Sequence, residues 1–323
     1  MTEFSVSVIM PAFNAEAFIG EALASVLSQT FSDLEIIVVD DCSTDNTMAI
    51  VSQMAELDGR IKCVRNEKNA GPSSSRNAGI RAARGKWIAL LDADDEYTVE
   101  RIDRLMAVAM ANPDASVISD NVMIRYPDGF QSLEPRSHNE HVLTLSEFIS
   151  GCKASRINKG RAGLSFLKPI IKRHFLSKNS ISYQEHIRNG EDLLLYIECL
   201  VKGAKWVAIP EAMYLYRVID GSLVENNSWE SQLWVIDYVR GLKIGMQKGS
   251  SDDYNALRLF LSYLRSVLYY NHTREEVLAW RFMSAISFMK NDKIAPYLIL
   301  REILSRAPSL LGKVVSGSRL RTY

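Results

Sequence analysis

The chain has 323 residues, of which 47% are apolar and 24% are charged, with 38 basic and 38 acidic side chains. This length and apolar content suffice for one large or two modest folded domains and exclude an intrinsically disordered chain. A formal net charge of zero argues against nucleic-acid binding, because such binding generally depends on a basic surface that neutralises phosphates. The four cysteines lie far apart with no CxxC pair, which excludes a zinc ribbon or a disulfide scaffold and fits a reducing compartment.

The N-terminal residues give no indication of a targeting signal. The first of them, MTEFSVSVIMPAFN, include no basic stretch, and a proline and an asparagine interrupt their apolar run. No segment reaches the ~18 to 20 apolar residues that a membrane-spanning helix requires. We therefore expect a cytoplasmic protein that meets a membrane only at its inner face.

The first 120 residues alternate between short β-branched runs and amphipathic helical patterns. This alternation predicts an α/β fold built from βαβ units, with a mostly parallel sheet and helices on both faces. The continuous apolar runs IIVV (36–39) and IALL (88–91) are typical of strands that are covered on both faces. The expected strands are residues 6–10, 35–39, 61–64, 87–91 and 115–119, and the expected helices are residues 15–29, 44–57, 73–83 and 99–111.

The pattern changes after residue 120. The stretch 126–167 is polar and contains glycine, which predicts either a long functional loop or a short helix between loops. Helical periodicity returns at 190–201 and continues almost unbroken from residue 229 onward. We therefore predict one α/β domain over residues 1–220, with halves at 1–120 and 121–220, and a helical C-terminal region over 221–323. The helices expected in that region are 229–244, 254–270, 274–290 and 294–304.

The last 31 residues, 293–323, contain six basic side chains and one acidic side chain, interleaved with Ile, Leu and Tyr. Two interpretations stay open for this segment. It is either an amphipathic helix that lies on anionic lipid headgroups, or a basic surface helix that caps the C-terminal region.

Polar residues follow the predicted strands at the sheet edge where ligands bind in open α/β folds. The strongest cluster is Asp92-Ala93-Asp94-Asp95, because carboxylates this close repel one another unless a cation compensates them. A hard divalent ion, Mg²⁺ or Mn²⁺, bridged to substrate phosphates needs only one or two of them. The alternative is a solvated acidic loop in which Asp95 caps the next helix.

Three further polar segments belong to the same edge. Asp40 ends the second strand and could contact a ligand, whereas Asp41, Ser43 or Thr44 after it suits the N-cap of the next helix. NAGPSSSRNAGIR (69–81) opens a helix whose free backbone N–H groups form an anion site, with Arg76 as a planar donor; its alternative is a capped surface turn. Glu191 and Asp192 begin a later helix, either as a general base for an incoming hydroxyl or as acidic residues that stabilise a helix start.

Taken in order, these motifs closely resemble glycosyltransferase family 2, the inverting nucleotide-sugar enzymes with the GT-A fold. The matching segments are VSVIMPAFNAEAFIGEALASVLSQT, EIIVVDDCSTDNT, NEKNAGPSSSRNAGIRAARGKWIALLDADD and NGEDLLLYIECL. Within the family, the chain is similar to bacterial exopolysaccharide glucosyltransferases of the succinoglycan type. It has no QxxRW motif, which argues against a processive synthase and favours transfer of one sugar at a time. The family position filled by Cys42 is commonly Gly.

On the donor side, the resemblance implies that the nucleotide-sugar half is residues 1–120 of the catalytic domain. Pro11, Ala12 and Phe13 would pack on the nucleotide base, and Asp40 would accept a hydrogen bond from the uracil N–H. Arg76 would reach the uracil or the diphosphate. The implied donor is a UDP-sugar, with UDP-glucose the more specific expectation.

For the reacting groups, the resemblance implies that Asp92 holds the ribose and that Asp94 holds Mn²⁺ or Mg²⁺. Asp192 would be the base that deprotonates the acceptor hydroxyl, and Glu191 would orient Asp192 or the acceptor. Arg217, in YLYRVIDGS, matches a segment near the donor diphosphate. The implied acceptor, held by the half 121–220, is a saccharide or a lipid-linked oligosaccharide.

Two alternatives from other functional classes stay open. A nucleotidyltransferase would place a glycine-rich basic loop after the first strand, where this chain has Pro11 to Asn14. A nucleotide-sugar-binding protein without activity would be expected to lack Asp94 or Asp192, and both are present.

Overall fold

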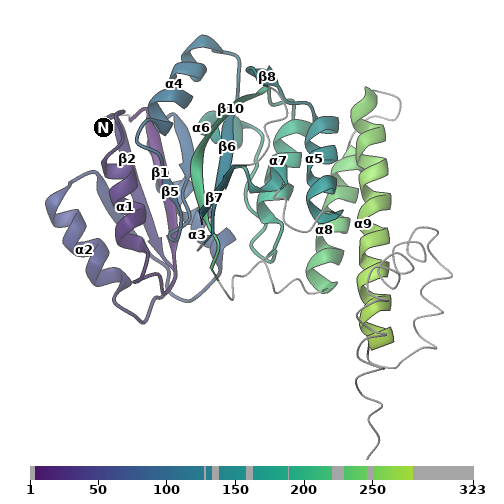
Figure 1. The fold of residues 1–323 in the computed structure, drawn as a ribbon, viewed down its shortest axis with the longest axis horizontal. Helices are drawn as coiled ribbons and strands as arrows, with labels where there is room; N and C mark the ends of the chain where they lie inside the picture. The colour runs from purple at the N-terminus through teal and green to yellow at the C-terminus, as the bar shows by residue number, and fades with distance from the viewer. Residues whose placement is uncertain are drawn as a thin grey trace, which may run out of the picture. The chain divides into compact units, whose positions relative to one another are not determined.

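The computed structural model describes residues 4–126, 129–132, 138–157, 163–187, 189–219, 229–245 and 251–278. These residues fall into two compact units (Figure 1). The first unit contains the described residues up to 219 together with 251–256. The second contains 229–245 and the described residues from 257 onward.

Four parallel strands form the N-terminal half of the sheet. They are β1 (Val6–Ala12), β2 (Leu34–Asp40), β3 (Ile61–Arg65) and β4 (Trp87–Leu90), in the spatial order β3-β2-β1-β4. Every residue of β2 and β4 is buried, as continuous apolar runs predict for strands with helices on both faces. Since β2 and β4 lie on opposite sides of β1, the winding direction reverses at β1, which is where ligands bind in such sheets.

The other half of the sheet contains strands of both directions. They are β5 (Glu96–Tyr97), β6 (Val117–Tyr126), β9 (Ile170–Lys172) and β10 (Trp206–Arg217), with β7 (Gly129–Ser132) paired to β6 and β8 (His141–Val142) paired to β10. β9 is antiparallel to both β4 and β6, β10 is parallel to β6, and β5 is antiparallel to β10. Because β1, β2, β3, β4, β6 and β10 run in one direction, the expected mostly parallel sheet is confirmed.

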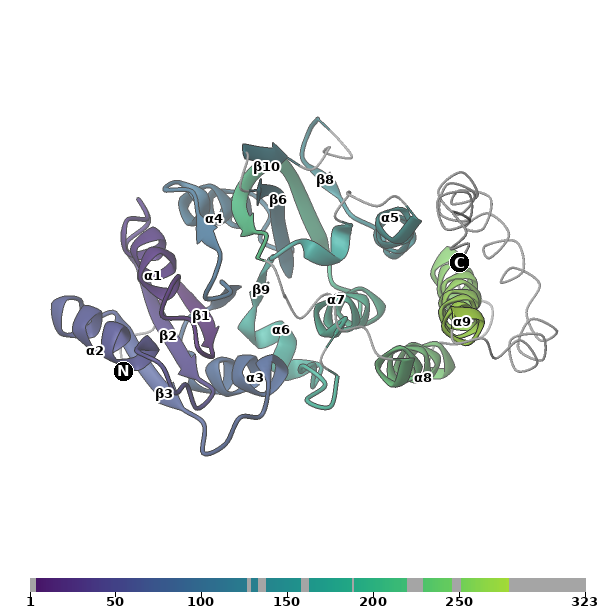
Figure 2. The ribbon, with the colours of Figure 1, turned by 60° about the horizontal axis from the view of Figure 1, so that its bottom comes forward.

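Helices cover both faces of this sheet (Figure 2). They are α1 (Ile19–Leu27), α2 (Thr47–Leu57), α3 (Pro72–Ala82), α4 (Arg101–Ala111), α5 (Leu145–Ile157), α6 (Arg173–Lys178) and α7 (Glu191–Val201), with a short 3-10 helix, η1 (Leu164–Phe166). α1 and α4 lie on one face, and α3 and α7 lie on the other. The stretch 126–167, expected as a long loop or a short helix between loops, contains α5, η1 and two short strands in its described part.

The second unit is helical in its described part. It contains α8 (Trp229–Gly245) and most of α9 (Ser251–Leu278). α9 runs through residues 271–273, where the sequence predicted a gap between two helices; these residues, Asn-His-Thr, include no Gly or Pro to end a helix. The expected helix at 294–304 and the basic segment 293–323 lie outside the described residues. Among the helices that the structure describes, none has the length and hydrophobicity to cross a membrane.

Gly79 allows α3 to pack directly on the sheet. A Cβ atom at this position would lie 2.2 Å from Cγ2 of Ile9 on β1 and 3.2 Å from Cγ2 of Val39 on β2. The absence of a side chain therefore sets the distance between helix and sheet. Because α3 also carries Arg76, this contact fixes how far Arg76 lies from the ends of the strands.

We expect Gly79→Ala to destabilise the fold. Overpacking a core costs about 1–3 kcal/mol, whereas Ala in place of Gly inside a helix contributes about 1 kcal/mol in the other direction. A clash at 2.2 Å belongs at the upper end of the first range, so the free energy of unfolding should fall by about 1–2 kcal/mol. Urea denaturation followed by circular dichroism measures the change.

Gly20→Ala in α1 is the matched control. Its Cβ atom would meet only Cγ2 of Ile50, at 3.9 Å, which is an ordinary van der Waals contact. We expect this variant to be as stable as the wild type or more stable, by up to about 1 kcal/mol. An unchanged Gly79→Ala variant, or equal losses in both variants, would contradict the close packing of α3.

Candidate active site

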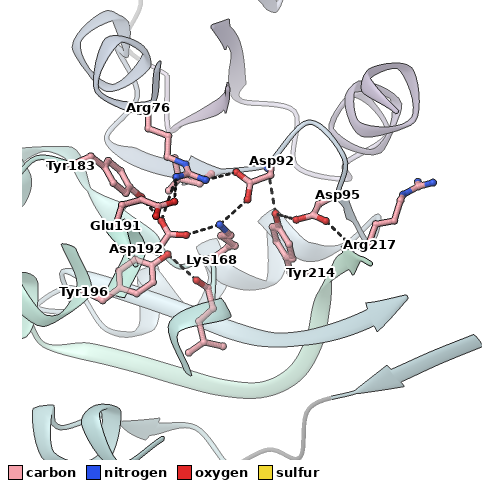
Figure 3. Close-up of polar contacts among 12 residues, drawn as sticks. Arg76, Asp92, Asp95, Lys168, Tyr183, Glu191, Asp192, Tyr196, Tyr214 and Arg217 are labelled. Atoms are coloured by element: carbon pink, nitrogen blue, oxygen red, sulfur yellow. Dashed lines mark hydrogen bonds and ion pairs between the residues drawn. The ribbon is translucent and has the colours of Figure 1, made fainter. Parts of the chain in front are cut away.

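The site lies beyond the C-terminal ends of the parallel strands, where segments far apart in the sequence meet (Figure 3). The acidic segment 92–95 follows β4, and α3 contributes Arg76. The N-terminus of α7 contributes Glu191 and Asp192, and the stretch between η1 and β9 contributes Lys168. Four residues expected from the sequence, Arg76, Asp92, Glu191 and Asp192, therefore lie in one cluster.

Two buried cations hold three carboxylates together in this cluster. Arg76 donates through Nη2 to Oδ1 of Asp92 at 2.7 Å and through Nη1 to Oε1 of Glu191 at 2.8 Å. Nζ of Lys168 donates to Oδ2 of Asp192 at 2.7 Å and lies 2.8 Å from Oδ2 of Asp92. Each cationic side chain is 5% exposed, so pairing is what makes burial of these charges tolerable. We call these five residues the charge cluster.

Burial and pairing act in opposite directions on the pKa values of the charge cluster. Burial alone would raise the pKa of Asp92, but Arg76 and Lys168 outweigh it and hold that pKa well below its usual range. Burial would lower the pKa of Lys168, and the carboxylates of Asp192 and Asp92 hold it well above its usual value instead. Asp92 and Lys168 are therefore both charged at neutral pH. The pKa of Glu191 is raised by burial, which Arg76 opposes and Asp192 reinforces.

Tyr183 is a second hydrogen-bond donor to Asp192, beside Lys168. Its O–H donates to Oδ1 of Asp192 at 3.0 Å, and the guanidinium of Arg76 lies over its ring, 5.4 Å from the centroid. Asn77 on α3 binds the backbone of Tyr183 on both sides: its Oδ1 accepts from N at 2.9 Å and its Nδ2 donates to O at 2.9 Å. Ser73, also on α3, donates to the carbonyl of Ile187 at 3.0 Å. α3 therefore holds the segment that places Tyr183 beside Asp192.

Asp95 is a structural anchor for the end of β10. Its Oδ2 accepts from the hydroxyl of Tyr214 at 2.6 Å, and its Oδ1 accepts from the backbone N–H of Arg217 at 2.8 Å. Because α4 begins only at Arg101, the alternative of Asp95 as the N-cap of that helix is wrong.

The guanidinium of Arg217 points away from the charge cluster (Figure 3). It donates to the carboxylates of Glu21 on α1 and, at 2.7 Å, of Glu96 on β5. Its Nε donates to the backbone carbonyl of Asp94 at 3.0 Å. Arg217 thus lies next to the acidic segment, with its charge shared between two carboxylates.

Asp94 offers a carboxylate suited to a hard divalent cation. Burial and the neighbouring Asp92 raise its pKa, which means that the surroundings disfavour its negative charge and that a cation would relieve it. Mg²⁺ and Mn²⁺ accept oxygen ligands from one or two carboxylates and complete their coordination with substrate phosphates and water. The donor chemistry at Asp94 therefore fits such an ion. Within the residues that the structure describes, no group of three His, Cys, Asp or Glu side chains is arranged as a metal-binding cluster.

The residues expected to bind the nucleotide base lie together at the ends of β1 and β2. Ala12 pairs with Asp40 in the parallel register, and Pro11 precedes Ala12 on the same strand. Phe13 follows directly and is 50% exposed. An exposed aromatic ring at the end of a buried strand is available to stack on a planar ligand.

Asp40 itself is enclosed. Its side chain is fully buried, its Oδ1 accepts from the backbone N–H of Ser43 at 3.1 Å, and its Oδ2 lies 3.2 Å from Nε of Arg65. The side chain of Arg65 is 61% exposed. Asp40 therefore contacts a backbone N–H group and an exposed guanidinium in this structure.

Asp41 has a different role from the N-cap that the sequence suggested. Its Oδ1 accepts from Nδ2 of Asn66 at 2.7 Å and from the backbone N–H of Ala70 at 2.9 Å, and its Oδ2 accepts from N of Gly71 at 2.7 Å. Asp41 thus holds the turn before α3, whereas α2 begins only at Thr47. The N–H groups of Ala70 and Gly71, just before the helix that was expected to offer an anion site, are therefore already bound to a protein carboxylate.

The motifs did not indicate Lys168 or Tyr183. Both lie in stretches without a recognisable pattern, and their roles arise from pairing with residues 24 and 9 positions later. A signal for Lys168 is nevertheless present. It stands in the run SFLKPII, and a lysine among apolar residues is buried only when a carboxylate pairs with it.

The fold is of the GT-A class. Residues 7–164 match the family model described as Glycosyl transferase family 2. The chain therefore carries a glycosyltransferase family 2 domain, and the resemblance expected from its motifs is confirmed.

Two curated proteins illustrate this relationship. The succinoglycan biosynthesis protein ExoO of Rhizobium meliloti (strain 1021) is 35% identical over 222 residues, which are 68% of this chain and 62% of ExoO. The UDP-Glc:alpha-D-GlcNAc-diphosphoundecaprenol beta-1,3-glucosyltransferase WfgD of Escherichia coli is 38% identical over 112 residues, which are 35% of this chain and 44% of WfgD. The matched part of this chain spans less than two thirds of the length of either relative.

Solved structures share the fold at lower sequence identity. S. aureus TarS 1–349 in complex with UDP-GlcNAc superimposes with a TM-score of 0.62 at 20% identity, over 89% of this chain and 92% of that one. The mannosyltransferase PcManGT from Pyrobaculum calidifontis, in complex with GDP-Man and Mn²⁺, gives a TM-score of 0.60 at 15% identity, over 95% of this chain and 81% of the other.

We expect Asn77→Ala to loosen the segment 181–187. The substitution leaves the buried N–H and C=O of Tyr183 without their partner, at a cost of about 1–3 kcal/mol in local stability. Amide hydrogen exchange in 181–187 should therefore become about 5- to 150-fold faster, while exchange in β1 and β2 stays unchanged.

Asn112→Ala is the control for this experiment, because Asn112 donates to Val108 and Glu140 and has no bond to the segment 181–187. It should leave exchange in that segment as it is in the wild type. Equal exchange rates in Asn77→Ala and wild type would show that α3 does not hold Tyr183 in place.

Proposed function

We propose that this protein is an inverting, metal-dependent glycosyltransferase that moves one sugar from a UDP-sugar to a saccharide acceptor. The finer proposal is transfer of glucose from UDP-glucose to a lipid-linked oligosaccharide in exopolysaccharide biosynthesis, at the cytoplasmic face of the membrane. The observation that carries the proposal is the charge cluster, in which Asp92 on the donor side and Asp192 on the acceptor side share Lys168.

Several features support UDP as the nucleotide of the donor. Phe13 offers an exposed ring beside the end of β1, and Asp40, buried at the end of β2, would accept a hydrogen bond from a base N–H. Asp92 lies at the end of β4, where a ribose attached to that base would extend. TarS, which shares the fold, is known in complex with UDP-GlcNAc.

Asp94 would hold Mn²⁺ or Mg²⁺ together with the donor diphosphate. When bound, the ion neutralises the negative charge that develops on the diphosphate as it leaves the sugar. Arg217 lies beside Asp94 and would reach that diphosphate only by leaving Glu21 and Glu96. PcManGT, another protein of this fold, is known with GDP-Man and Mn²⁺.

Asp192 is the proposed general base. In the reaction the acceptor oxygen attacks the anomeric carbon, the bond from that carbon to the diphosphate oxygen breaks, and Asp192 takes the acceptor proton. One displacement of this kind inverts the configuration, so an α-linked donor gives a β-linked product. Glu191 is held by Arg76 at the same helix start and would orient the acceptor.

The names of two relatives guide the choice of sugar and acceptor. WfgD is named as a glucosyltransferase that uses UDP-Glc and an acceptor on diphosphoundecaprenol. ExoO is named as a succinoglycan biosynthesis protein. Since both matches cover only part of the relatives, glucose and a polyprenyl-linked acceptor are the choices that we test first.

We expect UDP to raise the thermal unfolding midpoint only with Mn²⁺ present, and GDP and ADP to have little effect. A ligand that binds only the folded protein stabilises it by mass action. In Asp94→Ala the Mn²⁺-dependent part of the UDP shift should disappear, which corresponds to at least a ~10-fold loss of affinity. Differential scanning fluorimetry with each nucleotide, with and without Mn²⁺, measures both effects.

Asp103→Ala, on the exposed side of α4, is the matched control and should keep the full UDP shift. An Asp94→Ala variant with an unchanged shift would remove Asp94 as the metal ligand. A shift with every nucleotide would favour a nucleotidyltransferase, and a shift without any transfer activity would favour a non-catalytic nucleotide-sugar-binding protein.

We expect Asp192→Asn to bind UDP with Mn²⁺ like the wild type but to transfer sugar about 10²- to 10⁴-fold more slowly, because the amide cannot accept the proton. The assay measures UDP released from UDP-glucose in the presence of GlcNAc-diphosphoundecaprenol. Glu56→Gln, at an exposed acid on α2 away from the charge cluster, should transfer at the wild-type rate. Substantial transfer by Asp192→Asn would assign the base to another residue.

A further inference from the structure

We infer that Lys168 is a positioning residue for the base: it acts through Asp192 on the transfer step and does not set the affinity for the donor. This inference rests on the proposed function, because it needs Asp192 to take the acceptor proton. Lys168 lies between η1 and β9, outside every motif that indicated the site. Hydrogen bonds at its backbone carbonyl and at its side-chain ammonium both hold it in the charge cluster.

The backbone of Lys168 is held in place by a buried arginine, Arg101. Its carbonyl accepts a hydrogen bond from Nη2 of Arg101. Arg101 is fully buried and binds Asp120 through two hydrogen bonds, Nε to Oδ2 at 2.9 Å and Nη2 to Oδ1 at 2.7 Å. Its guanidinium also lies over the rings of Tyr97 and Tyr214, 4.2 and 5.3 Å from their centroids. This enclosed arginine therefore ties the Lys168 backbone to Asp120 on β6.

The ammonium of Lys168 and the hydroxyl of Tyr183 fix Asp192 from two sides. Lys168 donates to Oδ2 at 2.7 Å, and Tyr183 donates to Oδ1 at 3.0 Å. Because the donors belong to different segments and bind different oxygens, they define the orientation of the carboxylate as well as its position. Each carboxylate oxygen can accept a second hydrogen bond, so Asp192 retains capacity for the acceptor hydroxyl.

Lys168 bridges the carboxylates of Asp92 and Asp192, and this arrangement suits a base that loses its charge in each turnover. When Asp192 takes up the acceptor proton it becomes neutral, and a lysine paired with it alone would become an unpaired buried charge, which is costly. Lys168 keeps its ion pair with Asp92, 2.8 Å away, throughout this step. Proton uptake by Asp192 therefore does not leave the ammonium without a partner.

The geometry separates the effect of Lys168 on Asp192 from its effect on Asp92. Asp92 has a second close cation, since Nη2 of Arg76 lies 2.7 Å from its Oδ1. The approach of Arg76 to Asp192 is much longer, 3.9 Å from Nη1 to Oδ1. Without Lys168, Asp92 keeps a direct ion pair and Asp192 loses its own. The consequence should fall on kcat more than on the KM for the donor.

Lys168→Met tests this, because it keeps an unbranched side chain of similar length without the charge. With UDP-glucose, Mn²⁺ and GlcNAc-diphosphoundecaprenol, we expect kcat to fall about 100-fold while the KM for UDP-glucose changes less than ~3-fold. Lys168→Gln, which keeps a hydrogen-bond donor, should show the same split. The UDP-dependent thermal shift reports that each variant is folded and binds the nucleotide.

A double variant distinguishes action through Asp192 from a general structural effect. A residue that acts only through Asp192 has no further effect once the base is gone, so Asp192→Asn and Asp192→Asn/Lys168→Met should have equal kcat values. Lys172→Met is the matched control, because Lys172 donates to the carbonyl of Pro113 at the far end of β9. It should leave kcat and KM at wild-type values.

Three results would overturn the inference while the proposed function stands: an unchanged kcat in Lys168→Met, a loss confined to the KM for UDP-glucose, or a further loss of kcat in the double variant. The second of these would show that Lys168 acts through Asp92. A wild-type protein that binds UDP but transfers no sugar would overturn the proposed function, and the role of Lys168 with it.

Discussion

The burial of three carboxylates with two cations at one edge of the sheet is the constraint on which the rest of the site depends. Neither cation can be withdrawn alone, because removal of Arg76 leaves Glu191, and removal of Lys168 leaves Asp192, without its close ion pair in a poorly hydrated position. Arg76 and Asp92 come from the N-terminal 120 residues, and Lys168, Glu191 and Asp192 come from the residues after them. The ion pairs therefore join the two halves of the first unit at the point where donor and acceptor would meet.

A second buried carboxylate shows why this cluster differs from a purely structural ion pair. Glu35, on β2, is fully buried and accepts from Ser7 at 2.7 Å, from Lys62 at 2.6 Å and from the backbone of Arg84 at 2.7 Å. The side chains of Lys62 and Arg84 are 40% and 35% exposed, so solvent screens these pairs. The cations of the charge cluster are almost completely enclosed, and each one is shared by carboxylates from different segments. Sharing of this kind positions several groups at once, which is what a reaction between two substrates requires.

The predictions from sequence hold where the determining interactions are local. The strands β1 to β4 and their helices follow from continuous apolar runs and helical periodicity, and the turn before α3 follows from Gly71, which has a positive φ, and Pro72 at the helix start. The roles of Asp41, Arg217 and Lys168 depend on partners elsewhere in the chain. No local pattern encodes such pairings. The antiparallel insertion of β9 between β4 and β6 is of the same kind, since a three-residue strand leaves almost no periodic signal.

The charge balance of the site gives a physical reason for the proposed metal dependence. With all of them ionised, Asp92, Asp94, Glu191 and Asp192 exceed the positive charges of Arg76 and Lys168 by two. The nearby guanidinium of Arg217 is already shared by Glu21 and Glu96. A nucleoside diphosphate brings further negative charge to this edge, and the repulsion would be strong because the site is partly shielded from water. A divalent cation held by Asp94 would offset this excess of two negative charges and leave the ion pairs that hold Asp192 as they are. In the proposed reaction, Lys168 would pair with the base Asp192 and the divalent cation with the leaving diphosphate, so that separate cations would serve the two groups.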